Sequence, residues 1–337
     1  MGLSMFMCKQ LTQTLLDNFS SGMLKMDVFN PRRHREKVII VMGATGTGKS
    51  RLSINLATHF PAEIINSDKM QAYEGLDIVT NKVTEEEQHG VPHHLLGILN
   101  PNADFPVTNF IDKASLAIES SLGRGRLPII VGGSNSYIEA LVDDDDYMFR
   151  SKYECCFLWV DASMSVLHSF VSKRVDQMLE NGMVDELRKM FDPNADYSRG
   201  IRRAIGVPEF DQYLRNEPFL DREQRGMLLQ EAVSQMKENT CRLACRQLGK
   251  IHRLRNMKGW NMHRFDATEV FQKQGREAEE AWDQLVAGPS VVIVSQFLYN
   301  FAAAAAATTT TTSLIPTNVA GIKVTRNVGP AIATATY

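Results

Sequence analysis

A glycine-rich segment early in the chain has the composition of a phosphate-binding loop. The residues GATGTGKS, from Gly43 to Ser50, match the pattern G-x-x-x-x-G-K-S/T, and an apolar run at 38–42 precedes them. Helix-spaced apolar residues follow, so an ordinary glycine turn with an exposed lysine is the weaker interpretation. Such a loop wraps a phosphate in backbone N–H groups, while Lys49 neutralises charge and Ser50 offers an oxygen to Mg²⁺. The loop predicts a phosphate-binding site but does not identify the phosphorylated ligand.

Two further strand-like runs end in residues suited to the same site. The run at 63–67 leads into Asn66-Ser67-Asp68, and the run at 127–131 leads into Gly132-Gly133-Ser134. Ligands of open parallel sheets bind beyond the carboxyl ends of the strands, so we expect Asp68 to face the phosphate loop. Taken alone, Asp68 could cap a helix and the two glycines could form a tight turn. Together, the three strand ends predict one convergent site.

Cationic residues recur on one face of a helix predicted near residue 240. Arg242, Arg246, Lys250 and Arg253 are spaced by four, four and three residues, which places them on one side of a helix. A solvated charged face is the usual explanation of such a stripe. Beside a phosphate loop, in a chain of net charge −2, we interpret it as a site for anionic substrates. Arg174, on another predicted helix, is a further candidate.

The elements that must position these residues predict an α/β fold. Apolar strands alternate with helices, which implies a P-loop NTPase-like parallel sheet with helices on both faces, followed by a mainly helical C-terminal lobe. The predicted strands are 38–42, 63–67, 127–131 and 156–160, and the clearest helices are 50–59, 107–122, 183–190 and 222–255. The predicted divisions are an N-terminal extension at 1–36, a P-loop core at 37–160, a helical lobe at 161–298 and a low-complexity, disordered tail at 299–337.

Composition excludes several classes of protein. With 44% hydrophobic and 23% charged residues the chain has ordinary globular composition, and a net charge of −2 provides no global basic field for nucleic acid. The 5 cysteines include no Cys-x-x-Cys spacing, which argues against structural zinc. No apolar run reaches the roughly 18 residues of a membrane span, so we expect no membrane partner, and we expect a monomer.

The ordered series of motifs resembles the isopentenyltransferase family, and within it the plant adenylate isopentenyltransferases. The motifs are GATGTGKS, NSDKMQAY (66–73), PHHLLGI (92–98), VGGSNSY (131–137), SKRVDQMLENG (172–182), IRRAIGVPEF (201–210) and CRLACRQ (241–247). The resemblance runs from about Lys37 to Leu298. It implies transfer of a dimethylallyl group to the N6 amine of adenine, in tRNA or in a free nucleotide; with a free nucleotide this is the first step of cytokinin biosynthesis.

The resemblance also implies roles for particular residues. It assigns the phosphates in the loop to dimethylallyl diphosphate, with Asp68 as general base. Thr45, Lys49, Arg174 and Arg246 complete the implied catalytic set, and Ser50 is the implied ligand of the Mg²⁺ cofactor. The donor diphosphate is expected at Gly43, Ala44, Thr45, Gly46, Thr47, Gly48, Lys49, Ser50 and Ser134, and the acceptor at Asn66, Ser67, Asp68, Arg242 and Lys250. Cys245 stands where bacterial tRNA enzymes commonly have lysine, which leaves the division of charge among Arg242, Arg246 and Lys250 open.

Two absences favour a free nucleotide as acceptor. Between 131–142 and 155–170 the chain lacks the helical insertion with which the tRNA enzymes grip an anticodon arm, and no zinc-finger cysteines follow Arg246. We therefore expect ADP or ATP, ahead of AMP, and no tRNA partner. The alternatives are a tRNA dimethylallyltransferase, a small-molecule P-loop kinase and a phosphate-binding module without catalysis. The basic end of residues 1–36 and the family favour a plastid enzyme, with the cytoplasm as the alternative.

Overall fold

The computed structural model describes residues 35–144 and 148–299. The predicted N-terminal extension and the predicted tail therefore lie almost wholly outside the described residues. From Glu36 onward the described chain belongs to one compact unit. None of the helices within the described ranges is both long enough and apolar enough to cross a membrane.

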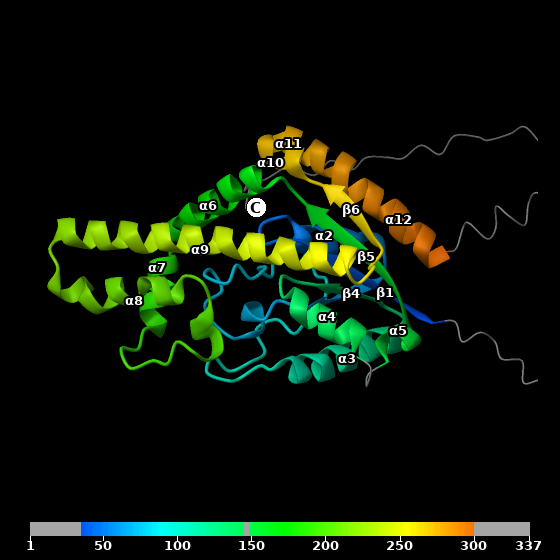
Figure 1. Ribbon diagram of the computed structural model, residues 1–337, viewed down its shortest axis with the longest axis horizontal. Helices are drawn as coiled ribbons and strands as arrows, with labels where there is room; N and C mark the ends of the chain where they lie inside the picture. The colour runs from blue at the N-terminus through cyan, green and yellow to red at the C-terminus, as the bar shows by residue number, and fades with distance from the viewer. Residues whose placement is uncertain (1–34, 145–147, 300–337) are drawn as a thin grey trace, which may run out of the picture. The chain divides into compact units, whose positions relative to one another are not determined.

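A six-stranded sheet forms the centre of this unit (Figure 1). The strands are β1 (Glu36–Met42), β2 (Ala62–Asn66), β3 (His93–His94), β4 (Leu127–Val131), β5 (Tyr153–Asp161) and β6 (Met262–Asp266). Their spatial order is β3-β2-β4-β1-β5-β6, and every neighbouring pair is parallel. The carboxyl ends of all six strands therefore lie at one edge, as predicted for a P-loop sheet.

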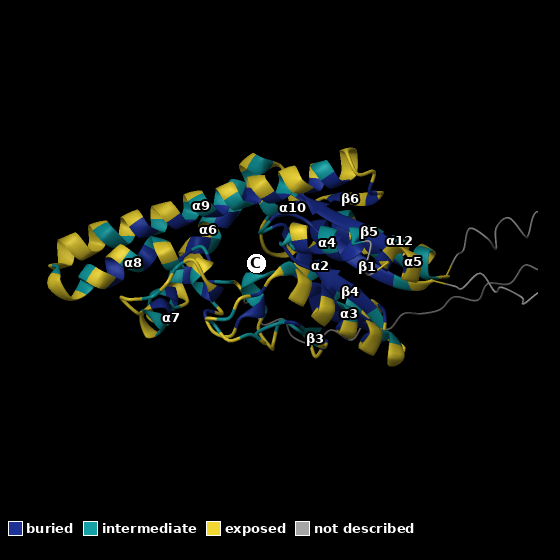
Figure 2. Cartoon of the chain, turned by 60° about the horizontal axis from the view of Figure 1, so that its bottom comes forward, coloured by how far each residue is buried: buried dark blue, intermediate teal, exposed yellow. Residues whose placement is uncertain are grey.

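Alternate residues of β1 enter two hydrophobic cores, one on each face of the sheet. Val38, Ile40 and Met42 belong to one core, whereas Ile39 and Val41 belong to the other. The first core includes residues of α3 (Val107–Gly123), α4 (Asn135–Asp143) and α9 (Arg222–Asn256); the second includes residues of α2 (Lys49–His59), α11 (Gly275–Trp282) and α12 (Gly288–Tyr299). Figure 2 shows the central strands buried and the outer sides of the helices exposed. The predicted cover of helices on both faces is confirmed.

The second half of the unit is mainly helical. It contains α6 (Met164–Glu180), α7 (Met183–Met190), α8 (Val207–Asn216) and the long α9, which packs against α4, α6 and α8 (Figure 1). The remaining short elements are α5 (Phe149–Lys152), α10 (Thr268–Gln272), η1 (Met70–Ala72), η2 (Gly200–Arg203), η3 (Glu217–Phe219) and the π-helical η4 (Asp283–Ala287). At the start of α9 the Asp221 carboxylate accepts a hydrogen bond from the Gln224 N–H, which caps the helix.

The last strand and the last helices were absent from the sequence prediction. β6 pairs with β5, so the sheet takes a strand from well beyond the predicted boundary at residue 160. Only Met262 and Phe265 of this strand are buried, as expected for a sheet edge, and two buried residues do not form a recognisable apolar run. The predicted helical lobe at 161–298 therefore includes one strand of the sheet and helices that pack against a face of the sheet.

A buried charged cluster holds the start of β2. The Glu63 carboxylate, 6% exposed, accepts hydrogen bonds from Arg124 Nε at 3.0 Å and Ser121 Oγ at 2.8 Å, and contacts His94 Nε2 at 2.8 Å. The hydrogen bonds from Arg124 hold the pKa of Glu63 down at about 2. The cluster ties β2 to β3 and α3, so it anchors the strand that leads to Asp68.

We predict that Glu63→Gln lowers the free energy of unfolding at pH 7 by about 2 kcal/mol, because the substitution removes the charge from three hydrogen bonds. The folded-state pKa lies below its ordinary value of 4.5, so this stabilisation is present above pH 4.5 and is lost as the pH falls toward 2. Urea denaturation at several pH values measures the difference between variant and wild type. The exposed Glu85→Gln serves as control. A difference that does not change with pH would contradict this account.

Candidate active site

The phosphate loop joins β1 to α2 and closes tightly on itself. Gly46 and Gly48 have φ values of 83° and 90°, a region that favours glycine. The Thr47 hydroxyl donates a hydrogen bond to the Ala44 carbonyl at 2.9 Å, and Lys49 Nζ donates to the same oxygen at 2.7 Å. The Lys49 ammonium therefore lies across the inside of the loop, where a phosphate would bind.

Two cations meet at this loop. Lys49 is only 9% exposed, and burial lowers its pKa to about 8, with Asp68 opposing the shift and Arg174 adding to it. Arg174, from α6, donates from Nη2 to Thr45 Oγ1 at 2.9 Å. Its buried Nε has no partner among the described residues, and burial lowers its pKa to about 10. Positive charges held out of water beside one carboxylate form a site that favours a bound anion.

The Asp68 carboxylate is fixed at the end of β2. The Asp68 N–H donates to Asn66 Oδ1 at 3.0 Å, and Asn66 Nδ2 donates to the carbonyls of Asp68 and Leu95. Asp68 Oδ1 accepts from the Met70 N–H at 3.0 Å, whereas Oδ2 lies 3.0 Å from the position of a Cβ added to Gly133. One carboxylate oxygen is thus used to hold the turn, and the other faces Gly133.

Three residues predicted to touch substrate lie at or beside this turn. The buried Asn66 uses both ends of its amide on backbone groups, and Ser67 is 1% exposed. Ser134 Oγ accepts a hydrogen bond from the Lys69 N–H at 3.0 Å, so it ties the end of β4 to the residue after Asp68. These contacts indicate that Asn66 and Ser134 position Asp68, whereas the buried Ser67 hydroxyl has no hydrogen-bond partner among the described residues. The predicted contacts of Asn66, Ser67 and Ser134 with substrate stay predictions.

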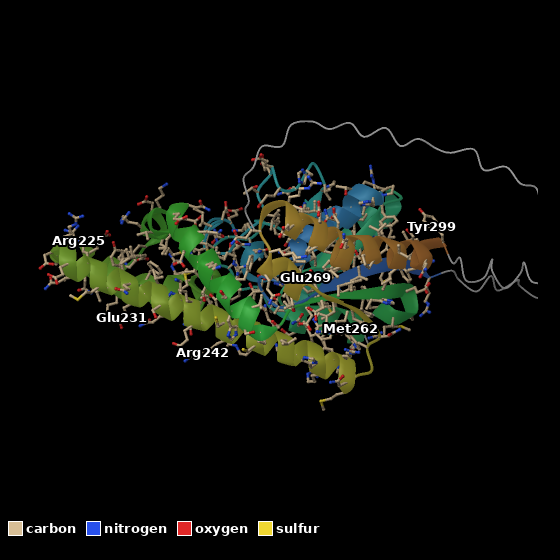
Figure 3. The ribbon with its side chains drawn as sticks, turned by 90° about the horizontal axis from the view of Figure 1, so that it is seen from above. Arg225, Glu231, Arg242, Met262, Glu269 and Tyr299 are labelled. Carbon is tan, nitrogen blue, oxygen red and sulfur yellow. The ribbon has the colours of Figure 1, made fainter. Side chains whose placement is uncertain are left out.

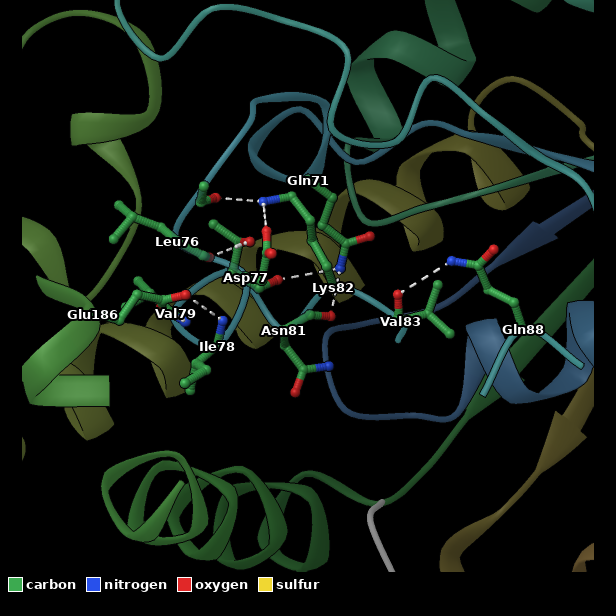
Figure 4. A network of polar contacts seen from close by, with 12 residues as sticks. Gln71, Leu76, Asp77, Ile78, Val79, Asn81, Lys82, Val83, Gln88 and Glu186 are labelled. Carbon is green, nitrogen blue, oxygen red and sulfur yellow. Dashed lines mark hydrogen bonds and ion pairs between the residues drawn. The ribbon is translucent and has the colours of Figure 1, made fainter. Parts of the chain in front are cut away.

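The loop beyond Asp68 is fastened to the helical half. Figure 4 shows Gln71 Nε2 donating to the carbonyls of Thr80 and Asn81, at 3.2 and 2.9 Å. The Glu186 carboxylate, from α7, accepts hydrogen bonds from the N–H groups of Ile78 and Val79, both at 3.0 Å. The segment that follows the candidate base is therefore held at both ends by side-chain hydrogen bonds.

Most of the predicted cationic stripe on α9 is exposed, but Arg253 is half-buried and forms an ion pair with Glu139 of α4. Arg242, Arg246 and Lys250 are exposed, whereas Ala244 and Gln247 of the same helix are buried. Arg242, 63% exposed, forms an i,i+4 ion pair with Glu238, and Figure 3 shows it on the outer side of α9. The structure therefore places Arg242 on the solvated surface, since its own helix neutralises it. The roles of Arg246 and Lys250 stay predictions.

Gln247 is a site residue that the sequence did not indicate. Its side chain is buried, Oε1 accepts from the Thr45 N–H at 2.7 Å, and Nε2 donates to the Gly133 carbonyl at 2.9 Å. The sequence offered one indication that Gln247 is buried: its spacing places it on the same side of the helix as the apolar Ala244 and Ile251. A polar residue in such a stripe needs buried partners, which only the fold reveals.

Trp282 is a second residue that the sequence did not indicate. A Cβ added to Gly48 would lie 2.8 Å from its indole ring, so α11 packs directly on the phosphate loop. Trp282 Nε1 donates to Asn55 Oδ1 at 2.8 Å, and the Arg51 guanidinium lies 4.4 Å from the ring centroid. The C-terminal helices therefore brace the start of α2.

The residues present fit a magnesium ion bound through a substrate. Within residues 35–144 and 148–299 no three His, Cys, Asp or Glu side chains are grouped so that they could hold a metal ion. Mg²⁺ is commonly held by one or two protein oxygens together with substrate phosphates. Ser50, exposed in the first turn of α2, carries a hydroxyl at the loop that could serve in this way.

The parallel sheet, the phosphate loop and the carboxylate at the next strand end define an α/β protein of the P-loop class with a site for phosphorylated ligands. A match to the family described as IPP transferase covers residues 71–151 and 143–253. The chain is 56% identical over 312 residues to adenylate isopentenyltransferase 3, chloroplastic, of Arabidopsis thaliana, covering 90% of this chain and 92% of that relative. It is 47% identical over 295 residues to an adenylate isopentenyltransferase of Humulus lupulus, covering 77% and 89%. The chain therefore belongs to the IPP transferase family.

Solved structures of related enzymes agree with this assignment. A eukaryotic dimethylallyltransferase acting on tRNA superposes with a TM-score of 0.65 and 26% identity, covering 79% of this chain and 80% of that one. A tRNA isopentenylpyrophosphate transferase from Bacillus halodurans gives a TM-score of 0.60 and 28% identity, covering 78% and 100%. The resemblance drawn from the motifs is confirmed, and the chain is a prenyltransferase.

We predict that kcat/KM for the diphosphate donor falls as the pH rises through about 8, because Lys49 then loses its charge in the free enzyme. Lys49→Arg should remove this descending limb, since a guanidinium stays protonated over this range. Steady-state rates between pH 6.5 and 9.5 measure both profiles. The exposed Lys189→Arg serves as control. A limb that persists in Lys49→Arg would assign the titration to another group.

Proposed function

We propose that this chain transfers the dimethylallyl group of dimethylallyl diphosphate to the N6 amine of a free adenine nucleotide, the first step of cytokinin biosynthesis. The observation that carries the proposal is the Asp68 carboxylate at a strand end beside Lys49 and Arg174. Relatives named adenylate isopentenyltransferase, 47% to 59% identical, support a nucleotide as acceptor. The tRNA enzymes of known structure are more distant, at 26% and 28% identity.

The phosphate loop binds the donor through its diphosphate. As the bond between C1 of the allyl group and the bridging oxygen breaks, negative charge develops on the leaving diphosphate. Lys49, Arg174 and the loop N–H groups stabilise that charge, with Thr45 held by its hydrogen bond from Arg174. Arg246 is proposed to add to this cationic surface. Ser50, together with the diphosphate, would hold Mg²⁺, which would supply further charge neutralisation.

Asp68 acts on the acceptor. The N6 amine of adenine is a poor nucleophile because its lone pair is delocalised into the ring. As nitrogen forms its bond to C1, Asp68 accepts a proton from the amine, and the products are the N6-dimethylallyl nucleotide and diphosphate. The free Oδ2, opposite Gly133, is the oxygen placed to take that proton.

The acceptor is proposed to be ADP or ATP rather than AMP or tRNA. The chain has a net charge of −2, whereas tRNA binding calls for an extended basic surface. Lys250 is the proposed contact for the outer phosphates of the nucleotide. In the competing small-molecule kinase, the loop would instead hold the triphosphate and Asp68 would activate a hydroxyl.

A plastid location is also proposed. Two relatives, 56% and 59% identical, are named chloroplastic, and another, 54% identical, is named mitochondrial. These names support an organelle, and the choice of plastid follows from the relatives of higher identity. The monomeric state stays a prediction.

We predict that kcat/KM is at least about tenfold higher for ADP and ATP than for unmodified tRNA carrying the target adenosine, a difference of about 1.4 kcal/mol in transition-state stabilisation. The four acceptors AMP, ADP, ATP and tRNA are compared at fixed donor concentration and fixed salt, because tRNA binding depends strongly on salt. A tRNA value equal to that of the best nucleotide would overturn the proposed acceptor. AMP as the best acceptor would overturn only the preference for ADP and ATP.

A further inference from the structure

A buried carboxamide joins the donor loop to the end of β4. Gln247, 7% exposed on α9, accepts from the Thr45 N–H through Oε1 at 2.7 Å and donates from Nε2 to the Gly133 carbonyl at 2.9 Å. The two partners are about 90 residues apart in the sequence, and Gln247 is more than 100 residues from either. One side chain thus connects three segments that the sequence keeps apart.

The contacts allow only one orientation of this amide. Thr45 offers a donor and Gly133 an acceptor, so the carbonyl and NH₂ ends of Gln247 cannot exchange places. The backbone carbonyl of Gln247 also accepts from Asn135 Nδ2 at 3.1 Å, which fixes the residue at a third point. A buried polar group is costly without its partners, so displacement of this amide carries a penalty.

The amide lies between the two groups that act on the substrates. On one side, Thr45 uses its N–H on Gln247 and its hydroxyl on Arg174, at 2.9 Å. On the other side, a Cβ added to Gly133 would lie 2.5 Å from Gln247 Nε2 and 3.0 Å from Asp68 Oδ2. The missing side chain of Gly133 leaves the space in which both the carboxamide and the carboxylate lie.

We propose that Gln247 is a positioning residue that sets the distance between the donor loop at Thr45 and the base Asp68. This inference rests on the proposed function, because it concerns the alignment of the allyl carbon with the N6 amine. Reacting groups must be held close to the productive geometry, and a displacement of about 1 Å can lower the rate about 100-fold. The hydrogen bonds of Gln247 to Thr45 and to Gly133 supply that constraint.

Gln247→Leu tests the proposal, because leucine has a similar volume and forms neither hydrogen bond. We expect kcat to fall by about 10- to 100-fold while the KM of each substrate stays within about threefold. Thr240→Val is the matched control: Thr240 is buried on the same helix, but among the described residues its hydroxyl bonds only to the Met236 carbonyl of α9. The control should keep the wild-type kcat. Unchanged kcat in a folded Gln247→Leu would overturn the proposal.

A double-mutant cycle separates positioning from a general loss of structure. Asp68→Asn alone should lower kcat by about 10²- to 10⁴-fold. In that background Gln247→Leu should lower kcat by less than about threefold, since no base remains to be misplaced. Equal losses in the two backgrounds would show that Gln247 acts through stability alone and would overturn the proposal.

A substitute variant covers the case in which Gln247→Leu does not fold. Gln247→Glu keeps the length of the side chain and the bond from Thr45, but its carboxylate cannot donate to Gly133. The same cycle with Asp68→Asn then applies, with the same expected and contrary results. Failure of the proposed function would appear as a wild-type enzyme that does not prenylate nucleotides, whereas failure of this inference leaves wild-type activity intact.

Discussion

The burial of Lys49 beside Arg174 is the constraint on which the rest of the structure depends. Burial removes water from the Lys49 ammonium and lowers its pKa to about 8, with Asp68 opposing the shift and the nearby Arg174 adding to it. The fold must therefore hold the loop from several sides: β1 precedes it, Trp282 packs on Gly48 from α11, and Gln247 binds Thr45 from α9. An anion bound beside these cations would offset the cost of their burial, which favours a phosphate-bearing ligand at the loop.

The strand order sets the geometry of the reaction. β4 lies between β2 and β1, so its Gly132-Gly133 turn separates the Asp68 turn from the phosphate loop. A Cβ on Gly132 would lie 2.4 Å from the Asp68 backbone nitrogen, and a Cβ on Gly133 would meet both Gln247 and Asp68. Small residues are therefore required between donor and base. The parallel sheet brings the three strand ends together, and the glycines let them approach closely.

The sequence predicted those elements that are determined by interactions between residues close in the chain. The strand at Leu127–Val131, the helix at Met183–Met190 and the setting of the phosphate loop follow from apolar periodicity and glycine spacing. β6 was not predicted because an edge strand buries few residues and therefore has no clear apolar pattern in the sequence. Gln247 and Arg242 show a second limit of prediction from sequence: helical spacing assigns residues to a common face of a helix but does not say which face is buried. Tertiary packing leaves Arg242 exposed, and it buries Gln247, among apolar neighbours, against the phosphate loop.

The central claim is that the phosphate loop holds the diphosphate of an allylic donor, while the nucleotide keeps all its own phosphates. The most direct measurement follows phosphorus label from dimethylallyl diphosphate, in a reaction with unlabelled ADP and Mg²⁺, by separating the products. This account predicts that all label released from the consumed donor is recovered as inorganic diphosphate. It also predicts that the product is N6-dimethylallyl ADP with both phosphates intact. Label recovered in the nucleotide, or phosphate lost from ADP, would show phosphoryl transfer and would contradict the account.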